Sequence, residues 1–470
     1  MTKRAKVIAK KIMEEHCLGI GIDKQRVKEL FDLATHIDES VAKSGIDATF
    51  KDIIEPLNDS FDAADRDVYY EIFSYVIQLI RDLPEAVHID KTLEAFGLFT
   101  QQDLLDRVRD LILPDKVGPA YRNNVKKVFV LSRVTIGADV AVTSIIIERS
   151  KKLFPNAQIC FLANSKNYEL FGGEENIKII PMDYQRRGGL ISRLESWLHA
   201  LESINSETKD MEPGEYAIID SNSRVTQLGL LPLVKKDTGY YLFEPLAHAD
   251  EEMRKLGEDV NEWLNKVFEG TIEDFTYPAL SVPARYNEAA KGFYQKLFNN
   301  KEFAVTVNFG VGGNDDKRIS DEFEFEVVLH LITQGAKVIL DEGFGEDEIE
   351  RSERLIDRLK ARGKAVMRVN EDLAFIEELK PDLITYKGGI GQFAALISQS
   401  QFYVGYDSMG QHVAAALEIP ELVVFNGYPT EKFSWKWHPY GKGKIKIIHA
   451  EGKAEKDVLE STKKILSVLS

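Results

Sequence analysis

The sequence predicts an α/β protein in which two parallel-sheet domains follow an all-helical N-terminal segment. From about residue 126 onward, short apolar runs alternate with longer amphipathic stretches, the pattern of strand–helix–strand units in a parallel sheet. Before that point no alternating β-branched run occurs. The length of 470 residues agrees with this organisation, because one domain takes roughly 150 residues.

The N-terminal segment, residues 1–118, is expected to form a helical domain. Its apolar residues recur at three- and four-residue steps, which places them on one face of a helix. The helices expected are 27–42, 68–83 and 103–113. The Gly118-Pro119 pair marks the end of this domain, since both residues interrupt regular structure.

Residues 119–290 are expected to form the first α/β domain. Their apolar runs are short and continuous, as in strands that are buried on both faces. The strands expected are 126–131, 158–163, 177–180 and 216–219, with helices at 139–153 and 190–204. The stretch 277–283 carries two prolines and is expected to link this domain to the next.

Residues 291–452 are expected to form the second α/β domain, and the segment 453–470 to hold a last helix. The same alternation of strand and helix patterns predicts this domain. The strands expected are 303–308, 336–340, 365–368, 402–406 and 422–425. The helices expected between them are 322–335, 346–363, 390–398 and 408–418.

The composition excludes several classes of protein. Apolar residues make up 44% and charged residues 29% of the chain, which is typical of a globular protein and not of a disordered one. The 60 Lys and Arg against 76 Asp and Glu give a formal net charge of −16, which argues against nucleic-acid binding because the phosphate backbone needs a basic surface. No run approaches the ~18 apolar residues of a membrane helix, and no signal peptide is expected.

Cysteine and histidine usage predicts neither a disulfide framework nor a metal site. Cys17 and Cys160 lie far apart, without the paired spacing of a zinc site or of a secreted scaffold. The nine histidines show no H-x-x-x-H or H-x-H spacing. We therefore expect a protein of the reducing cytoplasm without a metal site.

The sharpest local feature follows the strand 402–406. Asp407 and Ser408 stand where a helix begins, and Gln411 completes the pattern of a capping box with Ser408. Ligands bind at the carboxyl ends of parallel strands, and free N–H groups at a helix start attract anions. This helix start, with His412, is therefore a candidate phosphate site, although a helix cap with an exposed histidine explains the same residues about as well.

A second feature is the glycine-rich loop after the strand 303–308. Gly312 and Gly313 would let the backbone approach a phosphate, and Lys317 adds a positive charge beside them. The spacing is neither a Walker A motif nor a dinucleotide fingerprint, which would need a glycine where Asp315 stands. Taken alone, a surface turn with a solvated lysine is the favoured interpretation.

A third feature is Asp139, in the loop after the strand 126–131. The simplest role for this residue is the N-cap of the helix that follows. At the mouth of a sheet that faces a second domain, the same carboxylate could be a general base that takes the proton of an attacking hydroxyl. The cap is the favoured interpretation unless other observations support catalysis.

Weaker candidates lie in other loops. Gly388 precedes the helix 390–398 and could let a ligand approach the backbone, although a plain turn is the simpler interpretation. Arg186, Arg187 and Arg224 could contact an anionic acceptor, although most such charges are solvated.

Taken in order, these motifs resemble those of glycosyltransferase family 9, the ADP-heptose:lipopolysaccharide heptosyltransferases. In that family a Gly-Asp loop follows the first strand, a helix ends in Phe-Pro, a lysine after a small-residue loop binds phosphate, and the signature reads Asp-Thr-Gly-x-x-His-x-Ala-Ala-Ala before a Gly-Pro-Thr loop. The matching segments here are Ile136-Gly137-Ala138-Asp139, Leu153-Phe154-Pro155, Asn314-Asp315-Asp316-Lys317, 407–416 and Gly427-Tyr428-Pro429-Thr430. The resemblance covers about two thirds of the chain, from about residue 126 to 450.

The resemblance implies a GT-B fold, with two facing Rossmann-like domains, and an inverting, metal-independent glycosyltransferase that uses a nucleotide-diphosphate sugar, ADP-linked in the family. No cofactor is expected, since a nucleotide sugar would be a substrate. It implies Asp139 as the base, the diphosphate on Lys317, Ser408 and His412, and Glu348 near the nucleoside. The donor-binding residues proposed from the motifs and the resemblance together are Gly312, Gly313, Lys317, Glu348, Gly388, Asp407, Ser408, Met409, Gly410 and His412.

The sequence departs from the family pattern in several places. An alanine stands directly before Asp139, Met409 occupies the place of the signature glycine, and two glycines replace hydroxyl residues before Lys317. These departures bear on the identity of the donor more than on the fold. The helical first 115 residues have no counterpart in typical members of the family.

We therefore expect transfer of a heptose-like sugar to a hydroxyl of a glycan or other acceptor, in glycan or cell-envelope biosynthesis. The main alternative is a catalytically inactive GT-B protein that serves as a binding or assembly module. A dinucleotide-dependent oxidoreductase is disfavoured by the broken glycine fingerprint. The helical domain could serve oligomerisation, partner docking or acceptor recognition. We expect the protein in the cytoplasm, either free or bound peripherally to the inner face of the membrane.

Overall fold

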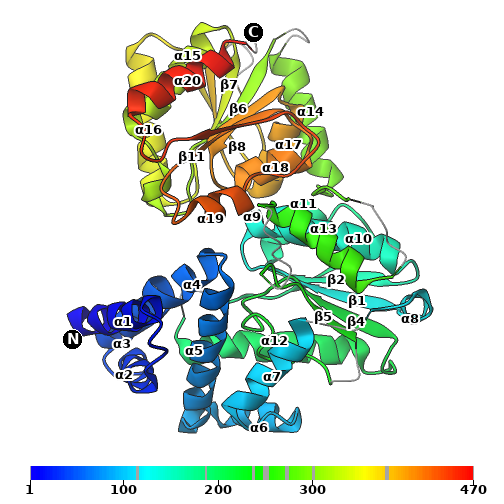
Figure 1. Cartoon of the computed structure of the whole chain (residues 1–470). Helices are drawn as coiled ribbons and strands as arrows, with labels where there is room; N and C mark the ends of the chain where they lie inside the picture. Colours follow the sequence, from blue (N-terminus) through cyan, green and yellow to red (C-terminus); the bar gives the residue numbers. More distant parts are fainter. Residues whose placement is uncertain are drawn as a thin grey trace.

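The structure is a computed structural model, and it describes residues 2–112, 116–185, 188–235, 239–246, 253–269, 275–298, 302–375 and 380–468. Figure 1 shows three parts: a group of N-terminal helices, a first parallel sheet and a separate second sheet. The two sheet domains are stacked end to end, and the helices lie beside the first sheet. The predicted α/β class with a helical extension is confirmed.

The N-terminal helices correspond to the predicted helical domain. They are α1 (Thr2–Cys17), α2 (Lys24–Ala34), α3 (Glu39–Thr49), η1 (Phe50–Ile54), α4 (Glu55–Asp59), α5 (Ala63–Arg81), η2 (Pro84–Ala86), α6 (Val87–Ala95) and α7 (Gln101–Ile112). The prediction of one helix over 27–42 is wrong, since two helices, α2 and α3, occupy that range. The Asp38 carboxylate accepts the N–H groups of Ser40 and Val41 and so begins a new helix.

The first sheet has five parallel strands in the order β3-β2-β1-β4-β5. The strands are β1 (Lys127–Leu131), β2 (Gln158–Ala163), β3 (Ile177–Pro181), β4 (Tyr216–Asp220) and β5 (Gly239–Leu242). The first four were predicted to within a residue at each end. The pattern does not predict β5, because four residues are too few to show a period.

The helices before and between these strands include one long stretch after β1. They are α8 (Pro119–Asn124), α9 (Ile136–Ala138), η3 (Asp139–Thr143), α10 (Ser144–Leu153), η4 (Ser165–Asn167), α11 (Tyr168–Phe171), α12 (Leu190–Thr208) and, after β5, α13 (Leu256–Val267). Because α9, η3 and α10 are continuous, Asp139 lies inside a helical stretch whose cap position is Thr135. The prediction of Asp139 as an N-cap is therefore wrong.

The second sheet has seven parallel strands in the order β12-β11-β10-β6-β7-β9-β8. They are β6 (Ala304–Asn308), β7 (Lys337–Asp341), β8 (Val366–Asn370), β9 (Leu383–Lys387), β10 (Phe402–Tyr406), β11 (Glu421–Phe425) and β12 (Ile445–His449). The pattern does not predict β9 or β12. The edge strand β12 carries a lysine and a histidine among its five residues, so it lacks the continuous apolar run of a central strand.

The helices of the second domain cover both faces of this sheet. They are α14 (Ala284–Leu297), η5 (Asp315–Lys317), α15 (Asp321–Thr333), α16 (Glu346–Ala361), α17 (Ile390–Gln399), α18 (Met409–Ala416), α19 (Glu431–Lys436) and α20 (Glu455–Leu466). Helix α14 packs against α17, and the last helix, α20, packs against α15. Residue 290, the expected domain boundary, thus lies inside a helix that belongs to the second sheet.

Three apolar layers hold these parts together. Phe129 and Leu131 of β1 share one layer with Phe73 of the helical domain. The next residues along the strand, Val128 and Val130, lie in a second layer that continues into the second domain. A third layer lies between the other face of the second sheet and helices α15, α16 and α20. Because side chains alternate along a strand, β1 anchors the helical domain on one face and the second domain on the other.

Two side-chain contacts link the second domain to the rest of the chain. The Lys436 Nζ of α19 lies 2.5 Å from the Asp259 Oδ2 of α13, and both side chains are at most 5% exposed. The ring of Phe61, from the helical domain, lies 6.2 Å from the ring of Phe433 in α19. The helical domain therefore contacts both sheet domains.

Three further findings concern membranes, thiols and metals. Within the described ranges no helix is both long and apolar enough to cross a bilayer. Cys17 is exposed, Cys160 is buried, and both are free thiols. Among the residues that the structure describes, no three His, Cys, Asp or Glu side chains form a group suited to a metal ion.

Removing one partner of the buried ion pair is expected to destabilise the protein. Lys436→Met leaves the Asp259 carboxylate buried without its cation, so we expect the free energy of unfolding to fall by about 3 kcal/mol. Chemical denaturation followed by circular dichroism measures this change.

The control for this variant is Lys442→Met. Lys442 and its partner Glu418 are both more than half exposed, so the loss should stay below about 1 kcal/mol. The double variant Asp259→Leu/Lys436→Met should recover most of the stability, because it removes both buried charges together. Equal losses for the two lysine variants would contradict a role for the buried pair.

Candidate active site

In each sheet the strand order reverses at one point, between β1 and β4 in the first sheet and between β6 and β10 in the second. Open α/β sheets bind ligands beyond the carboxyl ends of the strands at such a reversal. The motifs with Asp139, Lys317 and Asp407 follow β1, β6 and β10. All three therefore lie at a reversal point.

The two reversal points face each other across the domain interface. A Cβ atom added to Gly137 would lie 3.3 Å from the Cα atom of Met409, so the loop after β1 contacts the start of α18. Figure 1 shows α9 below α18, and the two helices are in contact. The structure thus brings the Gly137–Asp139 segment and the signature segment together.

Lys317 and Asp407 join the two loops of the second domain. The Lys317 Nζ lies 2.6 Å from the Asp407 Oδ2 and donates to the Asp407 backbone oxygen at 3.2 Å. The other carboxylate oxygen of Asp407 accepts a hydrogen bond from Gln411 at 2.6 Å. Asp407 thus positions the loop, and an ammonium group with three N–H donors keeps one for a phosphate oxygen.

Ser408 occupies the N-cap position of α18 without making a side-chain cap bond. Its hydroxyl lies 3.4 Å from the Asn308 Oδ1 of β6, and Gln411 bonds Asp407 instead of Ser408. The predicted capping box is therefore wrong. Because the Ser408 side chain does not cap the first turn, the N–H groups around Met409 and Gly410 keep the polarity that favours an anion.

His412 lies one turn into α18 and is only 5% exposed. Burial lowers the pKa of His412 to about 4, against the opposing effect of Asp407, so the imidazole is neutral near pH 7. A neutral imidazole offers one N–H donor. The expectation of an exposed histidine is wrong; a histidine in this place can donate one hydrogen bond but no charge to a ligand.

The glycine-rich loop after β6 is held by Glu348. One carboxylate oxygen accepts the N–H groups of Val311 at 3.0 Å and Gly312 at 3.2 Å, and the other accepts that of Phe344 at 3.0 Å. Gly312 and Gly313 both have positive φ angles, which explains the two glycines without a ligand. The carboxylate thus occupies amide donors that the motif would otherwise offer to a phosphate.

Glu348 also lines a small pocket at the ends of β6 and β7. Glu324, Asp341 and Glu342 line the same pocket, together with the ring of Phe309. Burial raises the pKa of Asp341 to about 7. The carboxylates of this pocket can accept hydrogen bonds from hydroxyl and amino groups beside an aromatic ring.

Gly388 follows β9, away from the reversal point. Beside it, the N–H of Gly389 donates to Glu371, and the N–H of Gly391 donates at 2.8 Å to Glu169 of the first domain. Two carboxylates therefore occupy the start of α17. The structure does not bring Gly388 to the other donor residues, and this turn instead joins the two sheet domains.

Asp139 has no exposed surface. Its carboxylate accepts hydrogen bonds from the Ser132 hydroxyl at 2.6 Å, the Arg133 N–H at 2.8 Å and the Thr143 hydroxyl at 2.9 Å. Burial raises the pKa of Asp139 to about 6 despite these bonds. The expectation of a carboxylate on the surface of the cleft is therefore wrong for this conformation. Here the Asp139 carboxylate is buried and stabilises its own loop by hydrogen bonds.

The predicted acceptor arginines have different outcomes. The Arg224 guanidinium lies 5.6 Å from the centre of the Tyr69 ring and 3.5 Å from its hydroxyl, so this arginine faces the helical domain. Arg186 and Arg187 lie outside the described residues.

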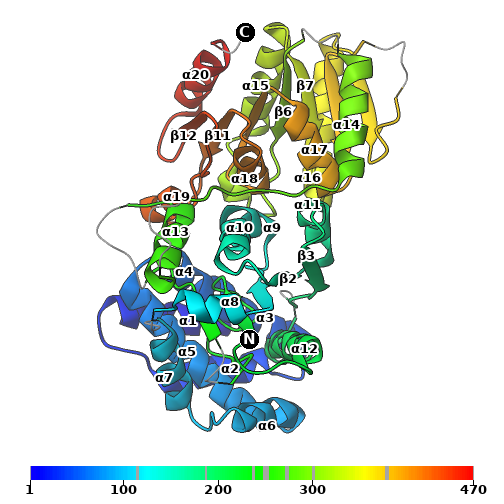
Figure 2. The ribbon, with the colours of Figure 1, turned by 90° about the vertical axis from the view of Figure 1, so that its right-hand side faces the viewer.

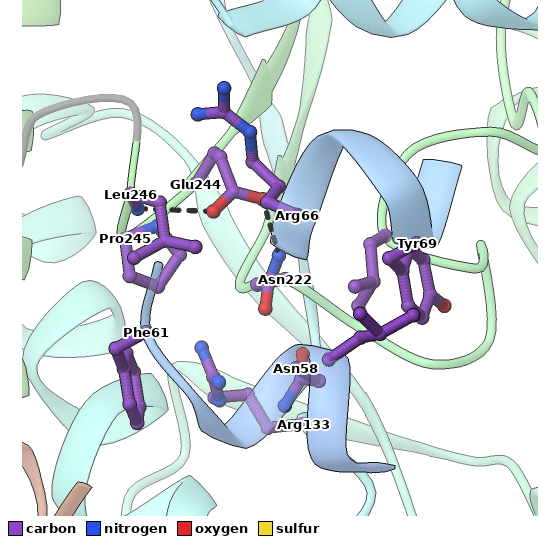
Figure 3. A pocket seen from close by; sticks show the side chains of 11 residues that line it. Asn58, Phe61, Arg66, Tyr69, Arg133, Asn222, Glu244, Pro245 and Leu246 are labelled. Carbon is purple, nitrogen blue, oxygen red and sulfur yellow. Dashed lines mark hydrogen bonds between the residues drawn. The ribbon is translucent and has the colours of Figure 1, made fainter. Parts of the chain in front are cut away.

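Sequence reasoning missed a cluster at the carboxyl ends of the first sheet. Arg133 follows β1, Asn222 follows β4, Glu244 follows β5, and all three line one cavity with residues of the helical domain (Figure 3). Arg133 lies only six residues before Asp139. The sequence could therefore have placed Arg133 in the same loop after β1, at the carboxyl end of the strand. Nothing in the sequence could show that α4 and α5 close the cavity from the other side.

Residues 315–466 match the family model described as glycosyltransferase family 9 (heptosyltransferase). The matched segment covers most of the second sheet domain, which is thus similar to this family. It contains Lys317, Glu348 and the whole signature segment 407–416. The resemblance predicted from the motifs is confirmed.

Three solved structures are similar to this chain. The glycosyl transferase family 9 protein from Veillonella parvula is 16% identical with a TM-score of 0.55, and the match covers 74% of this chain and 99% of that one. The E. coli heptosyltransferase WaaC with ADP is 18% identical with a TM-score of 0.48, over 73% and 100% of the two chains. E. coli ADP-heptose lps heptosyltransferase II is 16% identical with a TM-score of 0.46, over 73% and 99%. A comparison with curated protein sequences gives no match.

The GT-B fold predicted for the two sheet domains is confirmed by the likeness to the Veillonella structure. The match to the family 9 model supports the predicted glycosyltransferase activity. About a quarter of this chain lies outside the Veillonella match.

The buried position of the Asp139 carboxylate makes the stability of the protein depend on pH. Because its pKa is raised to about 6 in the folded state from 3.8, the folded state holds the proton more tightly than the unfolded chain does. Asp139 therefore lowers the free energy of unfolding by up to ~3 kcal/mol as the pH rises from about 4 to about 6. Asp139→Asn should lack this fall, which urea denaturation across the range measures.

Asp357→Asn, at an exposed position of α16, is the control and should keep the wild-type dependence on pH. A difference between wild type and Asp139→Asn that stays constant over the range would contradict the buried position of this carboxylate.

Proposed function

We propose that this chain is an inverting, metal-independent glycosyltransferase that uses a nucleotide-diphosphate sugar, with the donor on the second domain and the acceptor on the first. The acceptor oxygen attacks the anomeric carbon, the bond from that carbon to the diphosphate oxygen breaks, and the nucleoside diphosphate leaves with the electron pair. A base takes the hydroxyl proton. The observation that carries the proposal is the contact of the two reversal points at Gly137 and Met409.

The donor side supports this assignment through charge and donors. Lys317 and the uncapped start of α18 lie side by side, where they can stabilise a leaving diphosphate by charge and by N–H donors. The carboxylates of the pocket beside Glu348 can accept hydrogen bonds from hydroxyl and amino groups of the nucleoside. An ADP-linked, heptose-like donor is the choice that the resemblance to family 9 favours.

Asp139 remains the proposed base on the acceptor side. Its raised pKa of about 6 suits a group that must accept a proton near neutral pH. It lies two residues from the Gly137–Met409 contact. In this conformation the carboxylate is closed off, so catalysis requires the acceptor to displace a bond from Ser132 or Thr143.

The alternative, an inactive GT-B protein that binds or assembles, is favoured by one specific observation. The chain's own carboxylates already occupy key groups of the donor site: Asp407 pairs with Lys317, and Glu348 takes the N–H of Gly312. Such a module would bind no nucleotide sugar. The cytoplasmic location, the association with the inner membrane face and an oligomer remain predictions under either function.

Nucleotide binding separates the two functions. We expect ADP to bind the full chain, measured by titration calorimetry, and Lys317→Ala to weaken it about tenfold or more, because a charged hydrogen-bond donor is lost. His412→Ala should weaken it less, since only a neutral donor is lost. Lys446→Ala, at an exposed position of β12, should bind ADP as the wild type does.

UDP, GDP and CDP are titrated alongside ADP. If one of them binds and ADP does not, the proposed nucleotide is wrong but the proposed glycosyltransferase activity still stands. If none of the four nucleotides binds, the binding module is the better description.

Replacing the proposed base tests the chemistry directly. Asp139→Asn keeps the size of the side chain and should lower the transfer rate by ~100-fold or more with little change in ADP affinity. Transfer and donor hydrolysis are followed by release of the nucleoside diphosphate, with and without EDTA. An unchanged rate in the variant would exclude Asp139 as the base, and loss of activity with EDTA would contradict the metal-independent mechanism.

A further inference from the structure

The exposed face of α1 is strongly cationic. The segment 3–11 contains five Lys and Arg and no carboxylate, although the whole chain has a formal net charge of −16. Figure 1 shows this helix on the outer side of the helical domain, away from both sheets. The family match begins only at residue 315, so this surface lies outside it. The five exposed cations are Lys3, Arg4, Lys6, Lys10 and Lys11.

The opposite face of α1 holds the helix in this orientation. It packs against α2, α3 and η1, and four of its apolar residues are at most 6% exposed in the apolar layer of the helical domain. They are Ala5, Ile8, Ala9 and Ile12. Because this face is buried, the cations of the other face are held toward the solvent.

Two of the five cations have a carboxylate partner within the chain. The Arg4 Nη2 lies 3.2 Å from a carboxylate oxygen of Glu29, and the Lys10 Nζ lies 3.6 Å from one of Glu14. All four side chains are more than a third exposed, so these pairs contribute little to the stability of the fold.

The other three cations have no carboxylate partner in the part of the chain that the structure describes. They are Lys3, Lys6 and Lys11. Lys6 stands three residues from Lys3 and four from Lys10, and like charges at these spacings destabilise a helix. The stability of α1 therefore does not account for its charges, whereas an anionic surface outside the protein would.

Val7 lies in the middle of the cationic face and is 53% exposed. Its neighbours on the helix, three or four residues away, are Lys3, Arg4, Lys10 and Lys11. Just past the C-terminal end of α1, Leu18 and Ile20 are 73% and 68% exposed. A surface that offers both anionic groups and an apolar phase matches this combination.

We propose that the exposed face of α1 docks on a bilayer that contains anionic lipids. A cluster of about four to eight Lys and Arg on an amphipathic helix attracts anionic headgroups, and Val7 reaches the boundary between headgroups and acyl chains. A nucleic acid or an acidic polypeptide supplies the charge without an apolar phase for Val7.

Docking through α1 also orients the molecule. The rest of the chain is acidic, so an anionic bilayer repels it while attracting α1. The helical domain is thus the membrane-facing end of the protein, and this role goes beyond the proposed glycosyl transfer and does not depend on it.

Flotation of the full chain with lipid vesicles tests the proposal. Vesicles of phosphatidylcholine with about 30% phosphatidylglycerol are compared with vesicles of phosphatidylcholine alone. We expect binding to the anionic vesicles to be about tenfold tighter or more. It should weaken as NaCl rises from about 0.1 M to about 0.5 M, because salt screens exposed charges.

Removing the three unpaired charges should abolish most of this binding. Each lysine near an anionic leaflet strengthens binding about fivefold, so the triple variant Lys3→Gln/Lys6→Gln/Lys11→Gln should bind anionic vesicles about a hundredfold more weakly. Glutamine and lysine have similar helix propensities, so the circular dichroism spectrum should not change. Lys3→Arg/Lys6→Arg/Lys11→Arg keeps the charge and should bind as the wild type does.

The matched control changes the net charge equally at positions outside α1. It is Lys209→Gln/Lys442→Gln/Lys456→Gln, whose three lysines are each more than half exposed. This variant should bind anionic vesicles as the wild type does, because the charges removed do not face the bilayer.

Val7→Gln tests for the apolar phase. It should bind anionic vesicles about fivefold more weakly, because a half-exposed apolar side chain no longer enters the interface. A labelled DNA duplex and labelled poly-glutamate, titrated alongside, should bind more weakly than the vesicles do and should not distinguish Val7→Gln from the wild type.

Several results would overturn the proposal. They are an absence of flotation with anionic vesicles, equal binding to both kinds of vesicle, equal losses for the two Lys→Gln triple variants, and an unchanged Val7→Gln variant. Binding of the duplex or of poly-glutamate by a chain that does not bind anionic vesicles would assign this face to another partner and would overturn it too.

Discussion

All strands of each sheet run parallel, so their carboxyl ends share one edge, and this constraint determines where function can lie. The helical connections between parallel strands leave room for a ligand at this edge where the strand order reverses. Each sheet has one such place, and the two are pressed together at Gly137 and Met409. Of the described residues, Asp139, Lys317 and Asp407 follow the strands at these two places, whereas the turn at Gly388 lies away from them.

The polar groups around this point are compensated mainly from within the chain. Asp407 neutralises Lys317, Glu348 satisfies amides of the glycine loop, and Asp139 is surrounded by donors from its own loop. A ligand must therefore exchange partners with existing groups, so its binding free energy is the difference between new and old hydrogen bonds. Arg133 differs, since its bonded partner is a neutral carbonyl.

Much of the fold could be predicted from the sequence because buried parallel strands leave continuous apolar runs, as in β1 and β10. The short β5 and the charged edge strand β12 leave no such run. The placement of Lys317 beside Asp407 followed from motif order, but the burial of His412 and Asp139 did not. Burial depends on packing between elements that lie far apart in the chain, which one sequence does not reveal.

The phenyl rings of Phe61 and Phe433 touch, although more than three quarters of the chain separates them. During synthesis the helices and the first sheet can pack into their shared layer as soon as the first half has emerged, because domains fold as units from the N-terminal side. Helix α19, which carries Phe433, is made only later. The contact of Phe61 with Phe433 therefore belongs to the last stage of folding, when the second sheet domain docks against a helical domain that is already in place.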